Sequence, residues 1–413
     1  MIVTTALRSL KNDPRRSFFY LLTFVLTTMQ IYLFFNIAAS FPGSRGSIDS
    51  SNGTVTVLTM TTIVVCSIEI IFANNFFIRN KAKDMAVLLT CGCTYVQLAG
   101  YLLLQTSILL AISIPTGMLL GTAVIPLLNR MTTEFQIAVH GEAIFVMLWI
   151  LAYIILWTTM VNLGYAYRNS ALNLLNATRV VRSDNSNLGF NLHMPKTFKQ
   201  IVSLLFFFGP IVIYFTSTEI PALFFAVIAI FGFTMMIDSV IIPFIGKMIK
   251  TKKLKNADYV AEMGFLRNDL QVLKPNMILL FLVVVFLIAE GISVKDKPSE
   301  LLLVNVSYLM MNILASLGVM FKYSTEVQAR PLFFRSLEHI GYMHKNLKKI
   351  IISEVVKLYG FVIVAALLHV VSIMIAEHVE MNICVFMIAG FLVPCLICGI
   401  INCRYYIRRT IGR

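Results

Sequence analysis

Two pairs of cysteines have a spacing that could bind a metal ion or carry out a redox reaction. Cys91 and Cys93 are separated by one residue, and Cys395 and Cys398 by two. A tetrahedral metal site needs four ligands, and neither pair is accompanied by a second pair or by a histidine at ligand spacing. We therefore expect no metal site, and we interpret these cysteines as small apolar residues within helices.

The sequence carries no recognisable set of catalytic residues. It has no Ser/His/Asp set, no paired-carboxylate motif and no H-E-x-x-H helix. A G-x-x-x-x-G-K-[ST] phosphate loop is also missing, because Gly246-Lys247 lacks the upstream glycine and the following hydroxyl. We therefore expect a non-catalytic chain that binds no cofactor of its own. A hidden membrane enzyme is the alternative.

Several ionisable residues lie inside long apolar runs, where a charge costs about 3 kcal/mol on insertion scales. Such side chains usually face other parts of the protein or a water-filled cavity. Glu69 is the deepest in its run, and together with Asp238 and Glu290 it is a candidate for a substrate path. The alternative is an interhelical hydrogen bond or, for Glu354 and Lys357, snorkelling to the inner edge of the membrane. The residues of this kind are Glu69, Asp238, Glu290, Glu354, Lys357 and His369.

The composition is that of a membrane protein. Of the 413 residues, 58% are hydrophobic and only 13% are charged, whereas soluble domains carry about 25% charged residues. Ten runs are long enough to cross a bilayer core, so we expect an all-α polytopic membrane protein with ten transmembrane helices. The first run is too long for a cleavable signal. The runs are Phe18–Ala39, Val55–Ile78, Leu98–Leu128, Ala143–Gly164, Ile201–Thr216, Ile220–Ile245, Met277–Val294, Leu301–Phe321, Ile350–Ala376 and Met381–Cys403.

The net charge of +14 is explained by its placement. If the N-terminus lies inside the cell, the great majority of the 34 Lys and Arg residues fall in cytoplasmic segments. This asymmetry follows the positive-inside rule and predicts a multi-pass protein of the cell membrane with both termini in the cytoplasm. The basic charge therefore reflects topology and contact with the lipid bilayer, and we expect no nucleic-acid partner.

A short charged segment, Arg79–Leu98, separates the second and third apolar runs. Gly92 ends its helical pattern as a C-cap glycine would. A helix of this kind, lying at the membrane surface between two spans, could dock a soluble partner and transmit its movement to the spans. The alternative is an ordinary amphipathic connector without a partner. Its apolar residues recur with helical spacing at Ile78, Ala82, Met85 and Leu89.

The charged segment returns in altered form later in the chain. Leu337-x-x-x-Gly341 matches Leu88-x-x-x-Gly92, and Arg330 precedes its glycine by as many residues as Lys81 precedes Gly92. We call residues 79–92 the first connector and residues 330–341 the second connector. Ahead of the first and seventh runs, Ala6–Asp13 and Met263–Asp269 also echo each other.

The connectors indicate two copies of one four-span unit, an internal duplication of a kind found in transporters. The two units would be joined through a two-span hairpin, between two cytoplasmic linkers. The expected order is an amphipathic entry helix at 1–17, the first unit at 18–164, a linker at 165–200, the hairpin at 201–245, a basic linker at 246–274, the second unit at 275–403 and a cytoplasmic tail at 404–413.

The pattern Lys81-x-x-Asp84-x-Ala86-x-Leu88-x-x-x-Gly92 resembles the connector of FtsX-like permeases of ABC transporters. Ten spans in a four-two-four arrangement are similar to the bacitracin-efflux permeases (the BceB type) of Gram-positive bacteria. Two departures are evident. Those permeases carry a large external domain between spans seven and eight, where this chain has only Lys295–Glu300, and Phe333 stands where Asp84 would align.

The resemblance implies a non-catalytic permease subunit. A separate cytosolic ABC ATPase, in two copies per permease, would hold ATP and Mg²⁺ and dock on the connectors. The substrate would be a peptide or lipid-linked molecule, in antimicrobial-peptide resistance or bacteriocin immunity. A sensor histidine kinase, or a small external subunit in place of the missing domain, is a further candidate partner. The expected coupling residues are Arg79, Lys81, Asp84, Met85, Leu88, Leu89, Gly92, Arg330, Phe333, Phe334, Leu337 and Gly341.

Two other functions remain as alternatives. An ATP-independent secondary transporter would need a midplane ion site built from convergent charges, for which Glu69 and Asp238 are the candidates. A signalling scaffold would regulate a sensor kinase without transporting anything. Transport and signalling are not distinguished by any motif in the chain.

Overall fold

The computed structural model is helical throughout the part of the chain that it describes, without a strand there. Ten of the described helices are long and apolar enough to cross a membrane, which confirms the expected all-α, multi-span class. Residues 1–13 of the expected entry helix and most of the expected linker at 165–200 lie outside the described residues. The described ranges are 14–41, 53–131, 136–168, 195–216, 222–252, 257–327 and 330–411.

The chain divides into two compact units. The first comprises Met1–Val181 with Asp296–Leu314, and the second comprises Arg182–Lys295 with Ala315–Arg413. Helix α11 (Pro298–Val327) contributes its first half to the first unit and its second half to the second. The expected two-span hairpin at 201–245 belongs to the second unit, where helix α8 (Ala222–Met236) packs against α10 (Ala257–Ser293) and helix α7 (Lys196–Thr216) packs against α13 (His344–Ala376).

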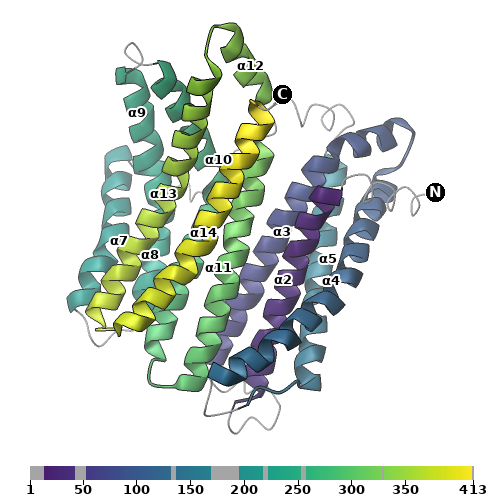
Figure 1. The fold of residues 1–413 in the computed structure, drawn as a ribbon, viewed down its shortest axis with the longest axis vertical. Helices are drawn as coiled ribbons and strands as arrows, with labels where there is room; N and C mark the ends of the chain where they lie inside the picture. The colour runs from purple at the N-terminus through teal and green to yellow at the C-terminus, as the bar shows by residue number, and fades with distance from the viewer. Residues whose placement is uncertain are drawn as a thin grey trace. The chain divides into compact units, whose positions relative to one another are not determined.

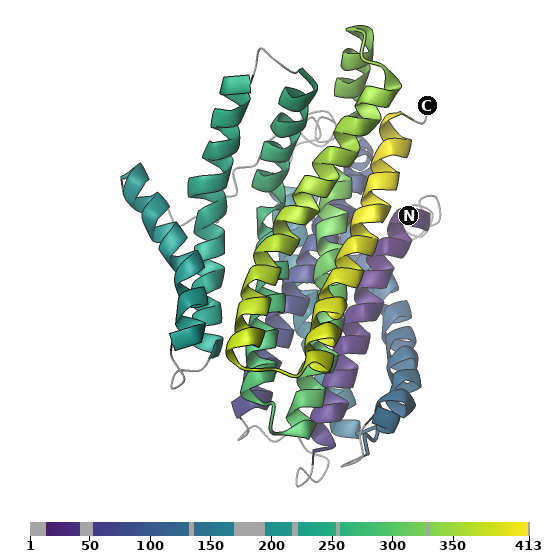
Figure 2. The same ribbon diagram turned by 60° about the vertical axis from the view of Figure 1, so that its left-hand side comes forward.

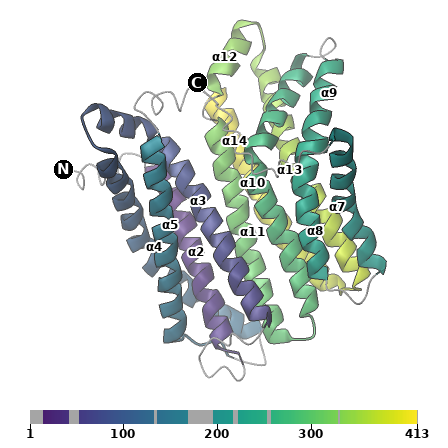
Figure 3. The ribbon, with the colours of Figure 1, turned by 180° about the vertical axis from the view of Figure 1, so that it is seen from behind.

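In the first unit, helix α2 is central and packs against the other three (Figure 1). Two glycines of α4 allow a close approach: a Cβ at Gly117 would lie 2.8 Å from the Thr28 side chain, and one at Gly121 would lie 2.5 Å from the Tyr32 ring. Figure 3 shows α3 beside α2 and α5 from the opposite side. The four helices are α2 (Pro14–Ala39), α3 (Gly53–Thr90), α4 (Tyr95–Met131) and α5 (Gly141–Arg168).

A chain of buried polar side chains joins three helices of the first unit. The Tyr20 hydroxyl of α2 donates to Asn74 of α3 at 2.9 Å, and the Asn74 amide donates to Asn162 of α5 at 2.6 Å. In an apolar core each of these groups would be costly without a partner, so the chain of hydrogen bonds specifies how the three helices pack.

In the second unit, helix α10 packs against α8 on one side and α13 on another, and α13 packs against α14 (Figure 2). Its helices are α7 (Lys196–Thr216), α8 (Ala222–Met236), the π-helix η1 (Ile237–Ile241), α9 (Ile242–Lys252), α10 (Ala257–Ser293), α12 (Pro331–His339), α13 (His344–Ala376) and α14 (Met381–Thr410). The expected basic linker at 246–274 is therefore largely helical: α9 runs to Lys252, and α10 begins at Ala257 and continues without a break into the apolar run.

The hairpin of α7 and α8 depends on Gly232, where a Cβ atom would collide with the backbone of Phe206 and Phe207. We expect Gly232→Ala to destabilise the protein by about 2 kcal/mol, because the two helices would have to separate. The matched control is Gly209→Ala on α7, where an added Cβ meets nothing within 4 Å. Thermal unfolding of the purified variants measures the difference, and equal unfolding temperatures for both variants would contradict it.

Candidate functional site

The first connector is not a separate surface helix, as the sequence pattern suggested. Residues 79–90 continue helix α3 from its start at Gly53, and only residues up to Ile78 belong to the part that could cross a membrane. The physical reason is that no glycine or proline follows Gly53 before Gly92, so nothing interrupts the helix. A force on this end of α3 would therefore act directly on a spanning helix.

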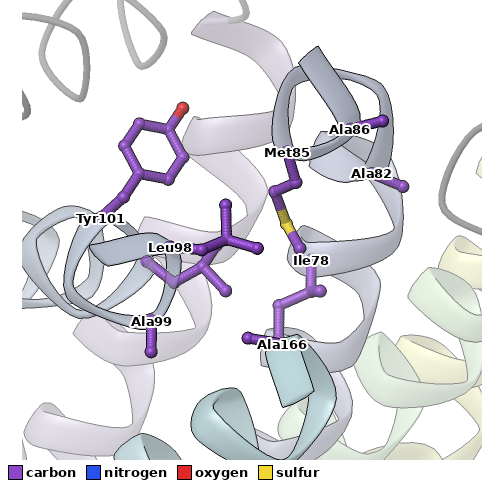
Figure 4. Packing of buried hydrophobic residues seen from close by; sticks show 9 residues of the cluster. Ile78, Ala82, Met85, Ala86, Leu98, Ala99, Tyr101 and Ala166 are labelled. Carbon is purple, nitrogen blue, oxygen red and sulfur yellow. The ribbon is translucent and has the colours of Figure 1, made fainter. Parts of the chain in front are cut away.

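The apolar face of the first connector is already covered by the chain itself. Met85 and Ala82 are fully buried and belong to one cluster with Ile78, Leu98 and Ala166, from α3, α4 and α5 (Figure 4). Met85 was expected to be a coupling residue, and this expectation is wrong because its side chain is buried within the chain. Leu88 and Leu89 are half-buried at the edge of this cluster.

The exposed face of the first connector is a mixture of charged and apolar residues. Lys83 and Asp84 point outward, and the Val87 side chain is 58% exposed. Lys81 is buried and forms an ion pair of 3.7 Å with the half-exposed Asp84, so its charge is not displayed on the surface as expected. Arg79 lies in α3, but its side chain is outside the described part.

Both connectors end in the same turn. Gly92 and Gly341 have φ angles of +88° and +104°, which glycine adopts without strain. In the first, the Cys93 N–H donates to the Leu88 carbonyl at 3.1 Å; in the second, the Tyr342 N–H donates to the Leu337 carbonyl at 3.1 Å. This hydrogen bond across the terminal glycine is that of the Schellman motif. The shared Leu-x-x-x-Gly spacing thus corresponds to a shared local structure, and the expected C-cap role of Gly92 is confirmed.

The second connector is a separate short helix, α12, outside the helices that could cross a membrane. Pro331 occupies its first turn, where the missing N–H costs nothing. Its outer face is unusually apolar for a non-spanning segment: Leu332 is 59% exposed, Phe333 49% and Ile340 75%. Leu337 is half-buried.

Phe334, unlike its half-exposed neighbour Phe333, lies in the core, although both rings contact that of Phe265. It is fully buried, and its ring stacks on that of Phe265 in α10, with centroids 5.5 Å apart and an interplanar angle of 8°. Phe334 was expected to contact a soluble partner, and this expectation is wrong because the side chain is part of the core of the second unit. The contact instead attaches α12 to α10.

Arg330, at the start of α12, is the centre of a buried ionic cluster. Its guanidinium donates to the carboxylates of Asp269 (α10) and Glu354 (α13), and to the Tyr406 hydroxyl (α14) at 2.9 Å. It also lies over the rings of Phe265, Tyr323 and Tyr406, 4.9–5.9 Å from their centroids. The guanidinium and both carboxylates are almost completely buried.

The charge of this cluster is stabilised by its own members. Burial opposes the charge of the guanidinium, but the carboxylates of Asp269 and Glu354 outweigh burial and raise the pKa of Arg330. Glu354 was interpreted as a group that could snorkel to water, and that interpretation is wrong because its side chain is buried against Arg330. Lys357, one turn further along α13, is instead half-exposed and pairs with Glu262 of α10.

The three candidates for a substrate path lie in different environments. Glu69 is buried in α3 of the first unit, and its Oε1 atom has no hydrogen-bond partner among the described residues. In the second unit, Asp238 of the π-helix forms an ion pair with Lys274 of α10, which is the interhelical pair considered as the alternative. Glu290, in α10, is also buried. Of the three, Glu69 remains the candidate for a site within the membrane.

The paired cysteines lie in different environments. Cys395 and Cys398 are buried in α14, Cys91 is exposed and Cys93 is half-buried. Across the described ranges, no cluster of three or more His, Cys, Asp or Glu side chains is arranged to hold a metal ion.

Similarity to known proteins does not assign the chain to a family. A comparison with models of protein families finds no match, and a comparison with curated proteins finds none either. The chain is a helical, multi-span, transporter-like membrane protein, and its two connectors lie outside the segments that could cross a membrane and end in the same turn.

Proposed function

We propose that this chain is the FtsX-like permease subunit of an ABC transporter, driven by a separate cytosolic ATPase. The observation that carries the proposal is the outer face of α12, where Leu332, Phe333 and Ile340 are exposed outside the spanning helices. Aromatic and aliphatic side chains displayed in this way are typical anchors of a protein–protein interface. The ATPase would supply ATP and Mg²⁺, and this chain would bind neither.

The shared turn of the two connectors supports two docking sites per chain. The first connector offers Val87 together with the charged Lys83 and Asp84. The second offers Phe333 and its apolar neighbours and no equivalent acidic residue. Two ATPase copies would therefore make unequal contacts, with the more apolar contact on α12. The distribution of Lys and Arg supports a cytoplasmic position for both sites.

The movement of the ATPase pair on closing would be transmitted to the spanning helices by two routes. In the first unit, α3 runs unbroken from the connector into its spanning part. In the second, α12 is attached through Arg330 and Phe334 to α10, α13 and α14. The proposed output is removal or export of a peptide or lipid-linked substrate, as in antimicrobial-peptide resistance. A sensor kinase or a small external subunit would be a further partner.

A secondary transporter is the second candidate, and Glu69 is the observation that favours it. A buried carboxyl group in a spanning helix with an unpartnered oxygen atom is the kind of group that binds protons or ions in such transporters. This function needs no soluble ATPase, so the docking experiment separates the two candidates.

The proposed docking on α12 is tested by Phe333→Asp. A buried interface anchor is often worth about 2 kcal/mol, so we expect a roughly thirtyfold loss of affinity for the ATPase. The measurement is the amount of ABC ATPase, identified by mass spectrometry, that co-purifies with the full chain from native membranes. Phe333→Leu is the matched control, because it retains an apolar anchor.

Membrane abundance should fall only slightly in Phe333→Asp, since the half-exposed ring loses one edge-on contact with Phe265. Wild-type ATPase content in Phe333→Asp would refute docking on α12. If no ABC ATPase co-purifies even with the wild-type chain, the secondary-transporter function is favoured.

A further inference from the structure

The ionic cluster at the start of α12 contains more acid than base. Five elements contribute its titratable side chains: Asp269 from α10, Tyr323 from α11, Arg330 preceding α12, Glu354 from α13 and Tyr406 from α14. Tyr323 and Tyr406 are neutral phenols at neutral pH. One guanidinium therefore faces two carboxyl groups, and the formal charge would be −1 if both were ionised.

A net charge in such a place is unfavourable. The carboxyl groups of Asp269 and Glu354 are fully buried, and their charges repel each other. Two carboxyl groups sharing one site do not both ionise readily, because burial and mutual repulsion both favour one neutral member. The second oxygen of Asp269, Oδ2, has no hydrogen-bond partner among the described residues. It offers a position for a hydrogen atom that the guanidinium does not occupy.

We propose that Asp269, which shares the Arg330 guanidinium with Glu354, is a proton-binding site that holds its proton at neutral pH and links proton release to the position of α12. With the proton bound, the cluster is neutral, with one carboxylate on the guanidinium and one carboxylic acid. On release, the O–H bond breaks, the proton passes to water, and the electron pair remains on the carboxylate.

The link to α12 follows from where the guanidinium is attached. Arg330 is the residue immediately before α12, so its side chain cannot move far without that helix. When the proton leaves, a buried negative charge remains, and water must enter to solvate it. Opening the cluster to water loosens the contacts that hold α12 to α10, α13 and α14. Conversely, a partner that displaces α12 would change proton binding, because linkage is reciprocal. This inference does not depend on which partner binds α12.

A nearby pair provides a natural control. Glu262 and Lys357 join the same two helices, α10 and α13, with Ser353 as a further donor to Glu262. One acid here faces one base, so the charges balance and no additional proton is expected. Glu262→Gln is therefore matched to Asp269→Asn in helix, chemistry and size.

The first test is infrared difference spectroscopy of the full chain in lipid vesicles at neutral pH. The signal is the carbonyl stretch of a protonated carboxyl group. Asp269→Asn and Glu354→Gln should each abolish one such band, because either variant leaves one acid facing one guanidinium. Glu262→Gln should leave the band unchanged. If no band is lost in either variant, both groups are ionised and the proposal is refuted.

The second test is hydrogen–deuterium exchange of the α12 amides as a function of pH, normalised to intrinsic exchange rates. In the wild-type chain, normalised exchange in residues 331–341 should rise with pH, whereas the segment 84–90 of α3 serves as an internal reference. In Asp269→Asn the cluster keeps the charge of its protonated state at every pH. The normalised exchange of the α12 amides in this variant should therefore not depend on pH. The same pH dependence in Asp269→Asn and in the wild type would refute the link between the proton and α12.

Discussion

Replacing Arg330 with glutamine is expected to destabilise the protein by about 3–5 kcal/mol, because it leaves two buried carboxyl groups without their cation. Asp269 and Glu354 both lose a charge-assisted hydrogen bond, and the Tyr406 hydroxyl loses its donor. The rings of Phe265 and Tyr323 also lose the cation that lies over them. The measurement is the thermal unfolding temperature in detergent, together with the abundance of the variant in membranes.

The matched control for Arg330→Gln is Lys357→Gln. Lys357 also pairs with an acid of α10, but its side chain is 38% exposed, so water can replace part of the interaction and the loss should be much smaller. A triple variant that combines Arg330→Gln with Asp269→Asn and Glu354→Gln replaces all three ionisable groups by neutral ones and should recover most of the stability. Equal unfolding temperatures for Arg330→Gln and Lys357→Gln would contradict the central role of the cluster.

Hydrophobicity predicted the spanning helices well, because each backbone polar group in a bilayer must be paired within its own helix. The ten predicted runs correspond in order to ten helices of the required length. The ends of the connectors were also predictable. Gly92 and Gly341 close their helices through backbone hydrogen bonds, and a glycine at this position depends on local geometry alone.

The function of the connector's apolar face could not be predicted in the same way. A helical repeat of apolar residues shows that one face is covered, but it does not show what covers it. Met85 is covered by Leu98 and by other residues of α4 and α5, so the helical repeat of apolar residues in the first connector reflects contacts within the chain. On α12, Phe333 is half-exposed and Phe334 is fully buried although both rings contact Phe265, and the sequence alone does not distinguish the two.

The Arg330 cluster was missed because its members are far apart in the sequence. Arg330 is 61 residues from Asp269 and 24 residues from Glu354. The lysines around residue 250 also gave 246–274 the composition of a linker, which placed Asp269 in solvent. The signal that could have revealed the cluster was the acidic residue Glu354 near the start of an apolar run, since a charge there requires a partner.

Met85→Asp is expected to unfold the first unit rather than to release a partner. It would place an unpaired carboxylate in the cluster formed by Ile78, Leu98 and Ala166, at a cost of about 4 kcal/mol or more. Membrane abundance and unfolding temperature should therefore fall whether or not an ATPase is present.

Val87→Asp is the matched control for Met85→Asp, two residues away on the same helix. The Val87 side chain is 58% exposed, so the new carboxylate stays in water and the abundance of the variant should match that of the wild type. If Val87→Asp nevertheless loses the ATPase, the first connector docks through its exposed face. Wild-type abundance of Met85→Asp would contradict the packing of α3 on α4 and α5, and it would restore the apolar face of the first connector as a candidate docking surface.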